Sequence, residues 1–447
     1  MAKIIIIGNG IAGSTAARYI RKNSDHDITM ISGETRFPFS RTALMYVYMG
    51  HMKFENTKLY EDWFWVKNRI NIITKWVQNI DTNTKTVSFY DGSSISYDKL
   101  IIATGSKPNK FGWPGQNLDG VQGLYHLQDL ENMETATQQG IKKAVVVGGG
   151  LIGIEMAEMF HSRHIPVTFL VREESFWNAV LPPEESEMIN KHILAHGIDL
   201  RLGEELLEIK GQHGKASAII CKNSGEVIPC EFVGLTVGVS PNIDFVKPSG
   251  ITINRGIVVD EYLETSAKDV YALGDCVELS NPNPGRRSIE AVWYTGRMMG
   301  KTVAQTICDK PTKYEPGIWF NSAKFFDIEY QVYGDIPAKT PAHITSLYWQ
   351  HPTENKAIRI NFDTASGAVT GFNLMGIRYR HAVCEKWIAD KTNIETVIEN
   401  LSLANFDPEF FEEFESAFVD KYNQKSGKSL KLKSKRKLSL VERFILG

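Results

Sequence analysis

Cysteine is scarce in this sequence, and its copies are poorly spaced for disulfide or metal chemistry. Five cysteines occur among the 447 residues, and no two of them form a Cys-x-x-Cys pair: Cys221, Cys230, Cys276, Cys308 and Cys384. An odd number without close pairs argues against a disulfide framework and against a metal or cluster site. We therefore expect no metal site and a reducing, cytoplasmic environment.

Long apolar runs and a strong charge imbalance are also absent. No stretch reaches the ~18 apolar residues that a membrane helix needs, and the short apolar run at the N-terminus lacks the cleavage site of a signal peptide. The formal net charge is −2, which gives no overall attraction to nucleic acid or to a membrane. The length predicts two or three domains with well-buried cores.

The C-terminal end departs from this charge balance. Residues 424–447 contain eight Lys or Arg and one acidic residue, Glu442. Basic runs of this kind are most often disordered and solvated, and this is the interpretation we favour. The alternatives are a docking arm for an acidic partner and peripheral contact with anionic lipid through residues 438–446.

The chain begins with a predicted strand, a glycine turn and a helix. The segment Lys3–Ile7 is typical of a strand buried on both faces of a parallel sheet. Glycines follow in G-x-G-x-x-G spacing, and a helical pattern runs from Ile11 to Lys22. Such glycines give a tight turn, room for a pyrophosphate and close helix–strand packing, while the helix N-terminus faces the phosphates. We predict a dinucleotide site made by Gly8, Gly10, Ile11, Ala12 and Gly13.

The same arrangement occurs a second time. Ala144–Val147 is a predicted strand, and the glycine spacing repeats before a helix predicted over Leu151–Arg163. One glycine turn after a strand is common, but two copies in one chain are hard to explain by chance. The second site consists of Gly148, Gly150, Leu151, Ile152 and Gly153. Two sites indicate two nucleotides that exchange electrons.

Two charged residues near the first turn are candidate ligands. Glu34 follows the predicted strand Asp27–Ser32, at a place where an acidic residue binds a ribose hydroxyl in dinucleotide sites. Ser32 is an alternative ligand, and Glu34 would otherwise be a solvated loop residue. Arg41 can clamp a pyrophosphate with its planar guanidinium, the ordinary alternative being a surface arginine without a partner.

Two later strands end in small turns. Residues 76–102 alternate like antiparallel strands with a turn at Asp91-Gly92, and then reach Ala103, Thr104 and Gly105, a turn suited to backbone contact with a flat cofactor. Another strand precedes Gly274 and Asp275, whose carboxylate is placed to accept from sugar-like hydroxyls, although a Gly-Asp pair is also common in plain turns. Residues 109–123 have the composition of a linker.

These motifs together resemble the pyridine nucleotide–disulfide oxidoreductase superfamily of flavoproteins. The resemblance runs from residue 3 to about residue 310, and it includes both glycine turns, Ala103-Thr-Gly105, Gly238-x-x-Pro241-Asn242 and Tyr271-Ala-x-Gly274-Asp275. It implies FAD at the first turn, with Asp275 at its ribitol, and NAD(P)H at the second. Gly238 then belongs to the cofactor-binding residues.

The fold that the resemblance implies is α/β, with two Rossmann-like dinucleotide-binding domains and a C-terminal α+β domain. The expected FAD domain spans residues 1–112 and 250–315, and the NAD(P)H domain spans 113–249. An aromatic, strand-rich and then helical domain follows at 316–423, ahead of the basic tail. A helix predicted over Ser288–Cys308 carries Glu290 and Trp293 in its first turns as candidate cofactor contacts, a core tryptophan being the alternative for Trp293.

Within the superfamily, the segment Pro38–Leu44 is similar to the Pro-Tyr-x-Arg-x-x-Leu segment of rubredoxin reductases, oxygenase ferredoxin reductases and the nitrite reductase large subunit. This similarity assigns Arg41, next to Ser40, to contact with FAD. Disulfide reductases and related oxidases keep a redox cysteine here, but this chain has Ser40, Arg41 and Thr42. A hydroxyl forms neither a disulfide nor a sulfenate, so thiol chemistry is excluded at this place.

Two further residues follow from the resemblance. Glu155 matches the glutamate beside flavin N5, and because the partner lysine near Met45 or Tyr46 is missing, it acts alone or through Arg41. Arg172 ends the strand Val167–Val171, as in NADPH-using glutathione reductases, although Glu173 and Glu174 would repel a 2′-phosphate. The balance leans slightly to NADPH over NADH.

The resemblance therefore implies an FAD-dependent NAD(P)H oxidoreductase. Hydride passes from NAD(P)H to the flavin, and without an internal cysteine the electrons leave for a small carrier, a rubredoxin or a ferredoxin-like protein. The alternatives are a membrane-associated NAD(P)H:quinone reductase, a slow-turnover redox-sensing interaction protein and a subunit of a larger reductase. A homodimer is compatible with all of these.

Overall fold

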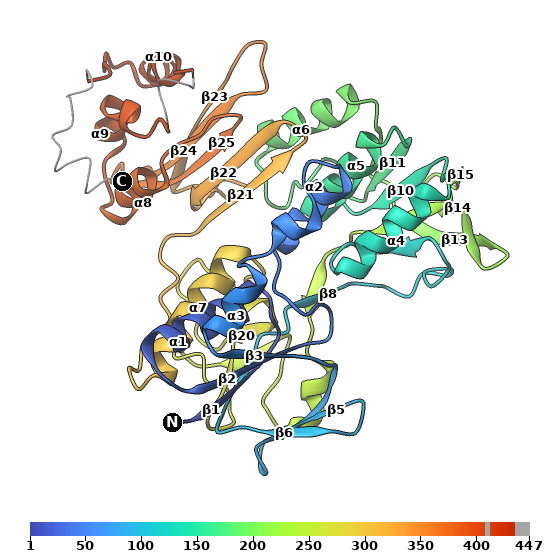
Figure 1. Cartoon of the computed structure of the whole chain (residues 1–447). Helices are drawn as coiled ribbons and strands as arrows, with labels where there is room; N and C mark the ends of the chain where they lie inside the picture. The colour runs from blue at the N-terminus through green and yellow to red at the C-terminus, as the bar shows by residue number, and fades with distance from the viewer. Residues whose placement is uncertain (407–411, 434–447) are drawn as a thin grey trace. The chain divides into compact units, whose positions relative to one another are not determined.

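The computed structural model describes residues 1–406 and 412–433, and the chain folds into two compact units (Figure 1). Unit 1 contains residues 1–169 and 205–316, and unit 2 contains residues 170–204 together with the described residues from 317 onward. Residues 434–447, which include the segment considered for lipid contact, lie outside the described residues.

A five-stranded sheet lies at the centre of unit 1, in the order β19-β7-β1-β2-β3. All neighbours pair in parallel: β19 (Val270–Ala272), β7 (Lys99–Ile102), β1 (Lys3–Ile7), β2 (Asp27–Ser32) and β3 (Ile70–Thr74). Ile4, Ile5 and Ile6 are fully buried, because the central strand of a parallel sheet is covered on both faces. The predicted buried strand at the N-terminus is confirmed.

Helix α1 (Ile11–Asn23) packs against α7 (Trp293–Ile307) beside this sheet (Figure 1). Glycine makes the close crossing feasible, since a Cβ at Gly300 would come 2.5 Å from the backbone oxygen of Ala12. The predicted start of α7 at Ser288 is wrong, because the helix begins at Trp293. Glu290 lies before the helix, where its carbonyl accepts from the N–H of Val292 and its buried carboxylate pairs with Arg286 at 2.5 Å. This ion pair holds the residues before α7 in an irregular conformation.

The antiparallel prediction for residues 76–102 holds for three strands and fails for the fourth. β4 (Val77–Asp81), β5 (Thr86–Phe89) and β6 (Ser94–Ser96) form an antiparallel sheet with a turn at Asp91-Gly92. β7 instead pairs in parallel with β1 and β19. Its residues 100–102 are fully buried, and a continuous apolar run is typical of a strand covered on both faces.

A second parallel arrangement surrounds the second glycine turn. β16 (Phe232–Leu235) pairs in parallel with β10 (Ala144–Val147) and with β9 (Val121–Gln122), which falls within the predicted linker. Helices α4 (Leu127–Gln138) and α5 (Leu151–Ser162) belong to this region, and β11 (Val167–Val171) follows them. An antiparallel sheet, β13 (Leu206–Gln212), β14 (Lys215–Cys221) and β15 (Val227–Pro229), completes it.

Shorter elements of unit 1 connect these layers. β8 (Ser106–Pro108) pairs antiparallel with β17 (Val239–Pro241), and β18 (Ile257–Val259) pairs in parallel with β20 (Val277–Leu279). The short helices are α2 (Leu44–Tyr48) and α3 (Asp62–Lys67).

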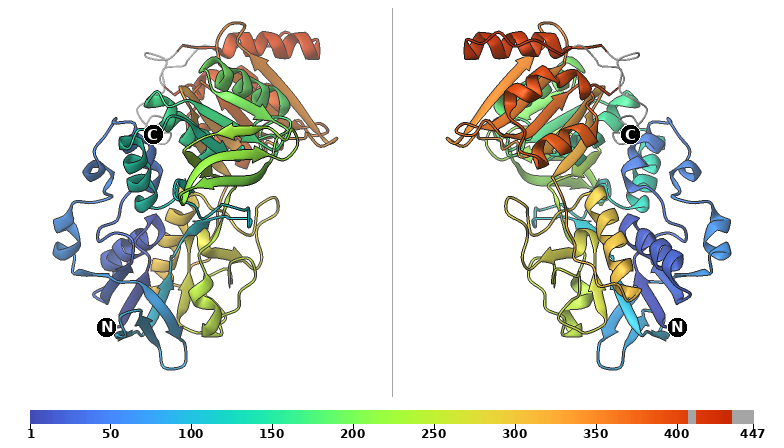
Figure 2. Two further views of the ribbon diagram at one scale, coloured as in Figure 1. Left: turned by 90° about the vertical axis from the view of Figure 1, so that its right-hand side faces the viewer. Right: turned by 90° about the vertical axis from the view of Figure 1, so that its left-hand side faces the viewer.

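Unit 2 is built on an antiparallel sheet in the order β21-β22-β25-β24-β23. Its strands are β21 (Phe320–Phe325), β22 (Ile328–Gly334), β23 (Ile344–Gln350), β24 (Ala357–Asp363) and β25 (Val369–Met375). Three helices accompany this sheet, drawn in red beside the orange strands in Figure 2: α8 (His381–Ala389), α9 (Ile394–Glu399) and α10 (Glu415–Ser426). Their residues Cys384, Val397 and Phe418 share a core with Ile360 and Phe372 of the strands. The remaining elements are α6 (Pro183–Ala195) and β12 (Asp199–Leu202). The predicted order, strands and then helices, is confirmed.

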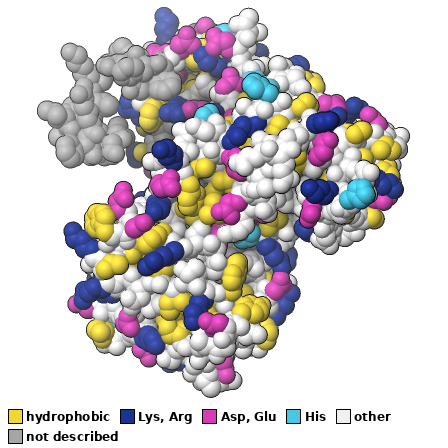
Figure 3. All heavy atoms as spheres, turned by 45° about the vertical axis from the view of Figure 1, so that its right-hand side comes forward, with side chains coloured by type: hydrophobic (Ala, Val, Ile, Leu, Met, Phe, Trp, Pro, Cys, Tyr) yellow, Lys and Arg dark blue, Asp and Glu magenta, His cyan; other side chains and the backbone are white. Residues whose placement is uncertain are grey.

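The predicted fold class is confirmed, with parallel Rossmann-like regions around both glycine turns and an antiparallel sheet domain towards the C-terminus. The exact domain boundaries stay a prediction. In the described part of the chain no helix is both long enough and apolar enough to cross a bilayer. Basic and acidic side chains are interspersed on the face drawn in Figure 3.

Candidate functional site

The first glycine turn has the sterics of a phosphate-binding turn. A Cβ at Gly8 would overlap the carbonyl oxygen of Ala103, and one at Gly13 would overlap that of Gly8, whereas a Cβ at Gly10 would meet nothing within 4 Å. Ser14 makes the first helical bond, from its N–H to the Gly10 carbonyl at 3.0 Å. The N–H groups of residues 11–13 therefore precede the helical bonding pattern and point out of its N-terminus, where an anion is favoured.

The second turn repeats this pattern of contacts. A Cβ at Gly148 would lie 2.5 Å from the Thr236 carbonyl oxygen, one at Gly153 would overlap the Gly148 carbonyl, and one at Gly150 would meet nothing within 4 Å. Leu151 and Ile152 begin α5, as Ile11 and Ala12 begin α1. In both turns the outer glycines are required by backbone packing, and the middle glycine leaves open space. The residues fit a pyrophosphate at each turn.

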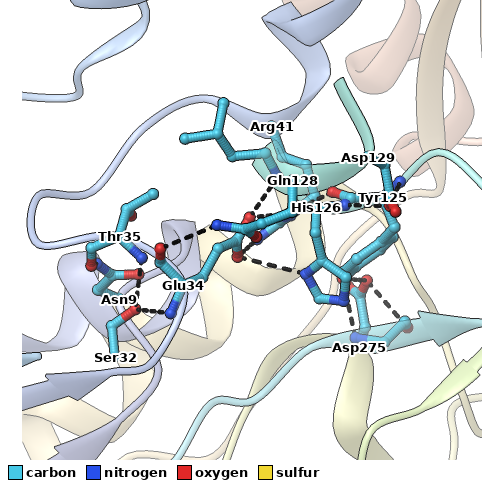
Figure 4. Close-up of polar contacts among 12 residues, drawn as sticks. Asn9, Ser32, Glu34, Thr35, Arg41, Tyr125, His126, Gln128, Asp129 and Asp275 are labelled. Carbon is cyan, nitrogen blue, oxygen red and sulfur yellow. Dashed lines mark hydrogen bonds and ion pairs between the residues drawn. The ribbon is translucent and has the colours of Figure 1, made fainter. Parts of the chain in front are cut away.

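Glu34 and Arg41 form an ion pair at the mouth of the first turn (Figure 4). Arg41 Nη1 donates to Glu34 Oε1 at 3.0 Å and Nη2 donates to Oε2 at 2.6 Å, and the Glu34 side chain is only 11% exposed. The N–H of Leu127, the first residue of α4, also donates to Oε1 at 2.8 Å. Burial alone would raise the pKa of Glu34, but contacts with His126 and Arg41 overcome it and lower the pKa to about 2.

The alternative interpretations of Glu34 and Arg41, which gave them no role in a site, are therefore wrong. Glu34 is not a solvated loop residue, and Arg41 has a partner. Ser32, the alternative ligand, turns its hydroxyl to the N–H groups of Glu34 and Thr35 at 3.3 and 3.4 Å, so it stabilises this turn. Ser40 precedes the short 3₁₀ segment of Arg41–Ala43, and its hydroxyl lies 3.2 Å from that of Thr42.

Tyr125 links this ion pair to Asp275 (Figure 4). Its carbonyl accepts from Arg41 Nη1, and the Arg41 guanidinium lies 4.5 Å from the centre of its ring. Its hydroxyl accepts from the Ser106 N–H at 2.8 Å and donates to Asp275 Oδ2 at 3.3 Å. Burial raises the pKa of Asp275. Asp275 therefore belongs to an ordered polar network and not to a plain turn.

The other predicted turns gather at the same place in unit 1. The Thr104 hydroxyl donates to the Asn242 carbonyl at 2.8 Å, and the Asn242 N–H donates to the Gly105 carbonyl at 2.9 Å. Gly238 has a φ of 89° and its carbonyl accepts from the N–H of Asn109 at 3.1 Å. A Cβ at Gly274 would come 3.1 Å from the Cβ of Ala12. The structure thus brings 103–105, 238–242, 274–275 and the first turn together.

Trp293 and Glu290 have separate environments. Trp293 is half-buried at the first position of α7, with its ring against Tyr294 and the guanidinium of Arg297 5.7 Å from its centre, so it is not a core tryptophan. Glu290 pairs with Arg286 through both carboxylate oxygens at 2.5 and 2.6 Å. Its carboxylate is thus already engaged inside the chain.

Glu155 lies on α5, two residues after the last glycine of the second glycine turn. It is half-buried, and burial, followed by repulsion from Glu158, raises its pKa to about 7. A carboxyl group that titrates near neutral pH can hold or release a proton at the pH of the cell.

The five cysteines are free thiols, and four of them are buried. Burial raises the pKa of Cys276, next to Asp275, to about 11, and its thiol donates to the Leu273 carbonyl at 3.3 Å. Because thiolate is the reactive form, this cysteine is unsuited to a redox relay.

Several residues of the site were missed by the sequence reasoning. Tyr125, His126 and Asn9 complete the network, Asn9 by donating to the Thr35 carbonyl at 2.9 Å. The sequence near Tyr125 carries one local feature that could have indicated these residues, namely the start of α4. There Asp129 accepts from the N–H groups of Tyr125 and His126 at 2.8 Å, as in a capping box.

Comparison with known proteins identifies the family. Residues 2–304 match the model of the pyridine nucleotide-disulphide oxidoreductases. The chain belongs to this family. It is an oxidoreductase that uses FAD and a nicotinamide nucleotide, as the resemblance of its motifs implies.

Named relatives extend over most of the chain. NADH-rubredoxin oxidoreductase of Clostridium acetobutylicum is 28% identical over 89% of this chain and 99% of its own length. A crystal structure of that enzyme superposes with a TM-score of 0.70 at 26% identity, covering 89% and 99% of the two chains. Rhodocoxin reductase of Rhodococcus erythropolis is 30% identical over 72% of this chain and 76% of its own length. NADH oxidase of Methanocaldococcus jannaschii is 30% identical over 73% and 75%.

Proposed function

We propose that this flavoprotein oxidises NADH and passes the electrons to a small redox carrier protein, a rubredoxin or a ferredoxin-like protein. The observation that carries the proposal is the combination of two dinucleotide turns in one chain with no cysteine between residues 37 and 46. An enzyme with a flavin and no thiol relay beside it must deliver its electrons outside the chain. Two of the relatives carry the name of a carrier, rubredoxin or rhodocoxin.

The bound FAD supplies hydride acceptance and one-electron release, and the chain's own residues bind and orient it. We propose that the helix N-terminus at residues 11–13 receives the pyrophosphate and that Asp275 accepts from a ribitol hydroxyl, as the family resemblance implies. In this proposal the dipole at the N-terminus of α7, which begins at Trp293, stabilises negative charge on the reduced flavin. Glu155, on α5 after the second turn, is proposed to hold or release a proton near neutral pH.

Binding of FAD is expected to change the partners of Glu34. A carboxylate has about four acceptor positions, and Glu34 accepts from two nitrogens of Arg41 and from the N–H of Leu127, while His126 Nδ1 lies 3.5 Å away without a hydrogen bond. A ribose hydroxyl would take the remaining position or replace one of these donors. Arg41 is the donor that gains a new partner, because a pyrophosphate offers its guanidinium a second bidentate contact.

NADH is the nicotinamide nucleotide that the structure favours, in place of the slight preference for NADPH expected from Arg172. Arg172 Nη2 lies 2.7 Å from Glu173 Oε1, so the charge that would attract a 2′-phosphate faces a neighbouring carboxylate. Glu173→Gln is expected to raise kcat/KM for NADPH by roughly three- to tenfold relative to NADH. An unchanged NADPH/NADH ratio would contradict this assignment.

Dioxygen is a second candidate electron acceptor, because one relative is named NADH oxidase. Quinone reductase and redox-sensor functions have no observation in their favour. The cytoplasmic location, the homodimer and the role of the tail stay predictions, the first resting on the free thiols.

Stopped-flow spectroscopy separates the two acceptors. The protein is reduced anaerobically with NADH and then mixed with a rubredoxin, with a ferredoxin-like protein or with air-saturated buffer. The proposal expects reoxidation by a carrier to be faster than by air. Reoxidation by air at a rate that no carrier exceeds would favour the oxidase and overturn the carrier proposal.

A further inference from the structure

Two histidines and an aspartate meet in unit 2, at the end of α6. His192 and His196 are one helical turn apart at the C-terminal end of this helix, and Asp327 lies in the two-residue turn that joins β21 to β22 (Figure 1). One ligand atom from each residue lies within 4.8 Å of the other two. Among the described residues this is the one such group of three. It lies outside the nucleotide-binding residues, and the expectation of no metal site considered cysteines alone.

A hydrogen bond decides which ring nitrogen of His196 can bind a metal ion. Its Nδ1 lies 2.9 Å from the backbone carbonyl oxygen of His192, and since a carbonyl only accepts, Nδ1 must carry the proton. Nε2 then carries the lone pair. A ring N–H that donates to a backbone carbonyl is the usual support of a metal-binding histidine.

His192 also has a polar neighbour at Nδ1. Its side chain is only 6% exposed, and its Nδ1 lies 3.0 Å from Nδ2 of Asn355. When the Asn355 amide is turned so that its oxygen accepts from the ring N–H at Nδ1, Nε2 carries the lone pair that can bind a metal ion. This Nε2 lies 2.5 Å from Asp327 Oδ1 without forming a hydrogen bond of good geometry.

The distances match a cation held between these atoms. Ligands at about 2.0–2.2 Å from a tetrahedral zinc ion are roughly 3.3 Å apart; here His192 Nε2 and Asp327 Oδ1 are 2.5 Å apart, and all three ligand atoms lie within 4.8 Å of one another. The Asp327 side chain is 80% exposed, so it can move back by the small distance required. Phe326 stacks on the His196 ring at 4.3 Å and holds the turn against the helix end, and a helix C-terminus favours a cation.

We propose that His192, His196 and Asp327 form a binding site for a divalent transition-metal ion, zinc by donor set. Two imidazoles and a carboxylate are typical zinc ligands, and the fourth position is left for water. The ion would tie the end of α6 to the β21–β22 turn and so stabilise unit 2. This role is independent of the flavin chemistry.

Equilibrium dialysis of the untagged, FAD-loaded protein against Zn²⁺ tests the site, after removal of metal with a chelator. The expected result is one zinc ion per chain and a rise in the melting temperature with zinc concentration, as for any ligand that binds only the folded state. Asp327→Asn and His196→Gln should each weaken zinc binding by at least roughly tenfold and remove the stabilisation. His343→Ala, an exposed histidine of unit 2, is the matched control and should bind zinc like the wild type.

Asp327→Asn changes an exposed side chain, so loss of folding cannot explain its result. FAD content, measured on the same samples, should be equal in all variants. The proposal is overturned if the wild-type protein binds no stoichiometric zinc, or if Asp327→Asn and His196→Gln bind it as tightly as His343→Ala does.

Discussion

At the scale of single residues, the site depends on charged groups whose partners lie far away in the sequence. Glu34 and Arg41 pair across a turn, and both contact the start of α4 near residue 125. Arg41 is partly buried and donates to both carboxylate oxygens of Glu34. A lysine at this position would supply the charge without the planar guanidinium that makes this bidentate contact.

Arg41→Lys should weaken FAD binding by roughly tenfold or more, since one of the two parallel hydrogen bonds to a carboxylate or pyrophosphate is lost. Release of FAD is followed by its fluorescence during dilution. Arg36→Lys is the control, because Arg36 is exposed on the same loop, and its FAD affinity should not change. Equal affinities for the two variants would remove Arg41 from the site.

Glu155→Gln should make stability less dependent on pH. The folded protein raises the pKa of Glu155 from 4.5 to about 7, so ionisation costs stability as the pH rises above 4.5, and the full cost is reached above about 7. The variant should therefore be more stable than the wild type at about pH 8, by about 1–3 kcal/mol after allowance for partial exposure, and equal to it near pH 4.

Urea unfolding at the two pH values provides the measurement. Glu187→Gln, on an exposed part of α6, should show no such difference between the two pH values. A Glu155→Gln variant that is no more stable than the wild type at the higher pH would mean that Glu155 is ionised without penalty.

At the scale of elements, the two glycine turns have the same internal sterics, and we expect each to bind a different nucleotide. The outer glycines of each turn face backbone atoms, and the middle ones, Gly10 and Gly150, face open space. The middle positions therefore allow each nucleotide site to be blocked without disturbing the fold.

Gly150→Ala should raise the KM for NADH by roughly tenfold or more while FAD content stays at the wild-type level, because the added methyl group faces the pyrophosphate and no protein atom. Gly10→Ala should lower FAD content instead. Both are measured by FAD absorbance after gel filtration and by the NADH dependence of flavin reduction. The account fails if Gly150→Ala loses FAD or if Gly10→Ala keeps it.

Much of this architecture could be predicted from the sequence because its signals are local. The isoleucine strand, the glycine spacing and the acidic residue after β2 lie within a few residues of the chemistry they serve. Tyr125 and His126 were missed because their role comes from tertiary proximity to Arg41 and Glu34. The start of α7 was placed too early because the Arg286–Glu290 pair holds the preceding residues out of the helix, and β7 was given the wrong direction because strand direction is not a local property.

At the scale of the whole molecule, the chain joins a parallel-sheet unit that carries both nucleotide turns to an antiparallel unit with its own core. The first unit contains both glycine turns and the network around Glu34, Arg41 and Asp275. The described cysteines are buried or only partly exposed and lie outside the segment at residues 37–46, so a complete catalytic cycle requires an external acceptor.

An anaerobic titration of the FAD-loaded protein with NADH, followed by addition of an oxidised rubredoxin or ferredoxin-like protein, tests this claim most directly. The account predicts that the visible flavin absorption bleaches with NADH and returns when the carrier is added, as the carrier becomes reduced. A flavin that does not bleach with NADH, or a reduced flavin that no carrier reoxidises, would contradict it.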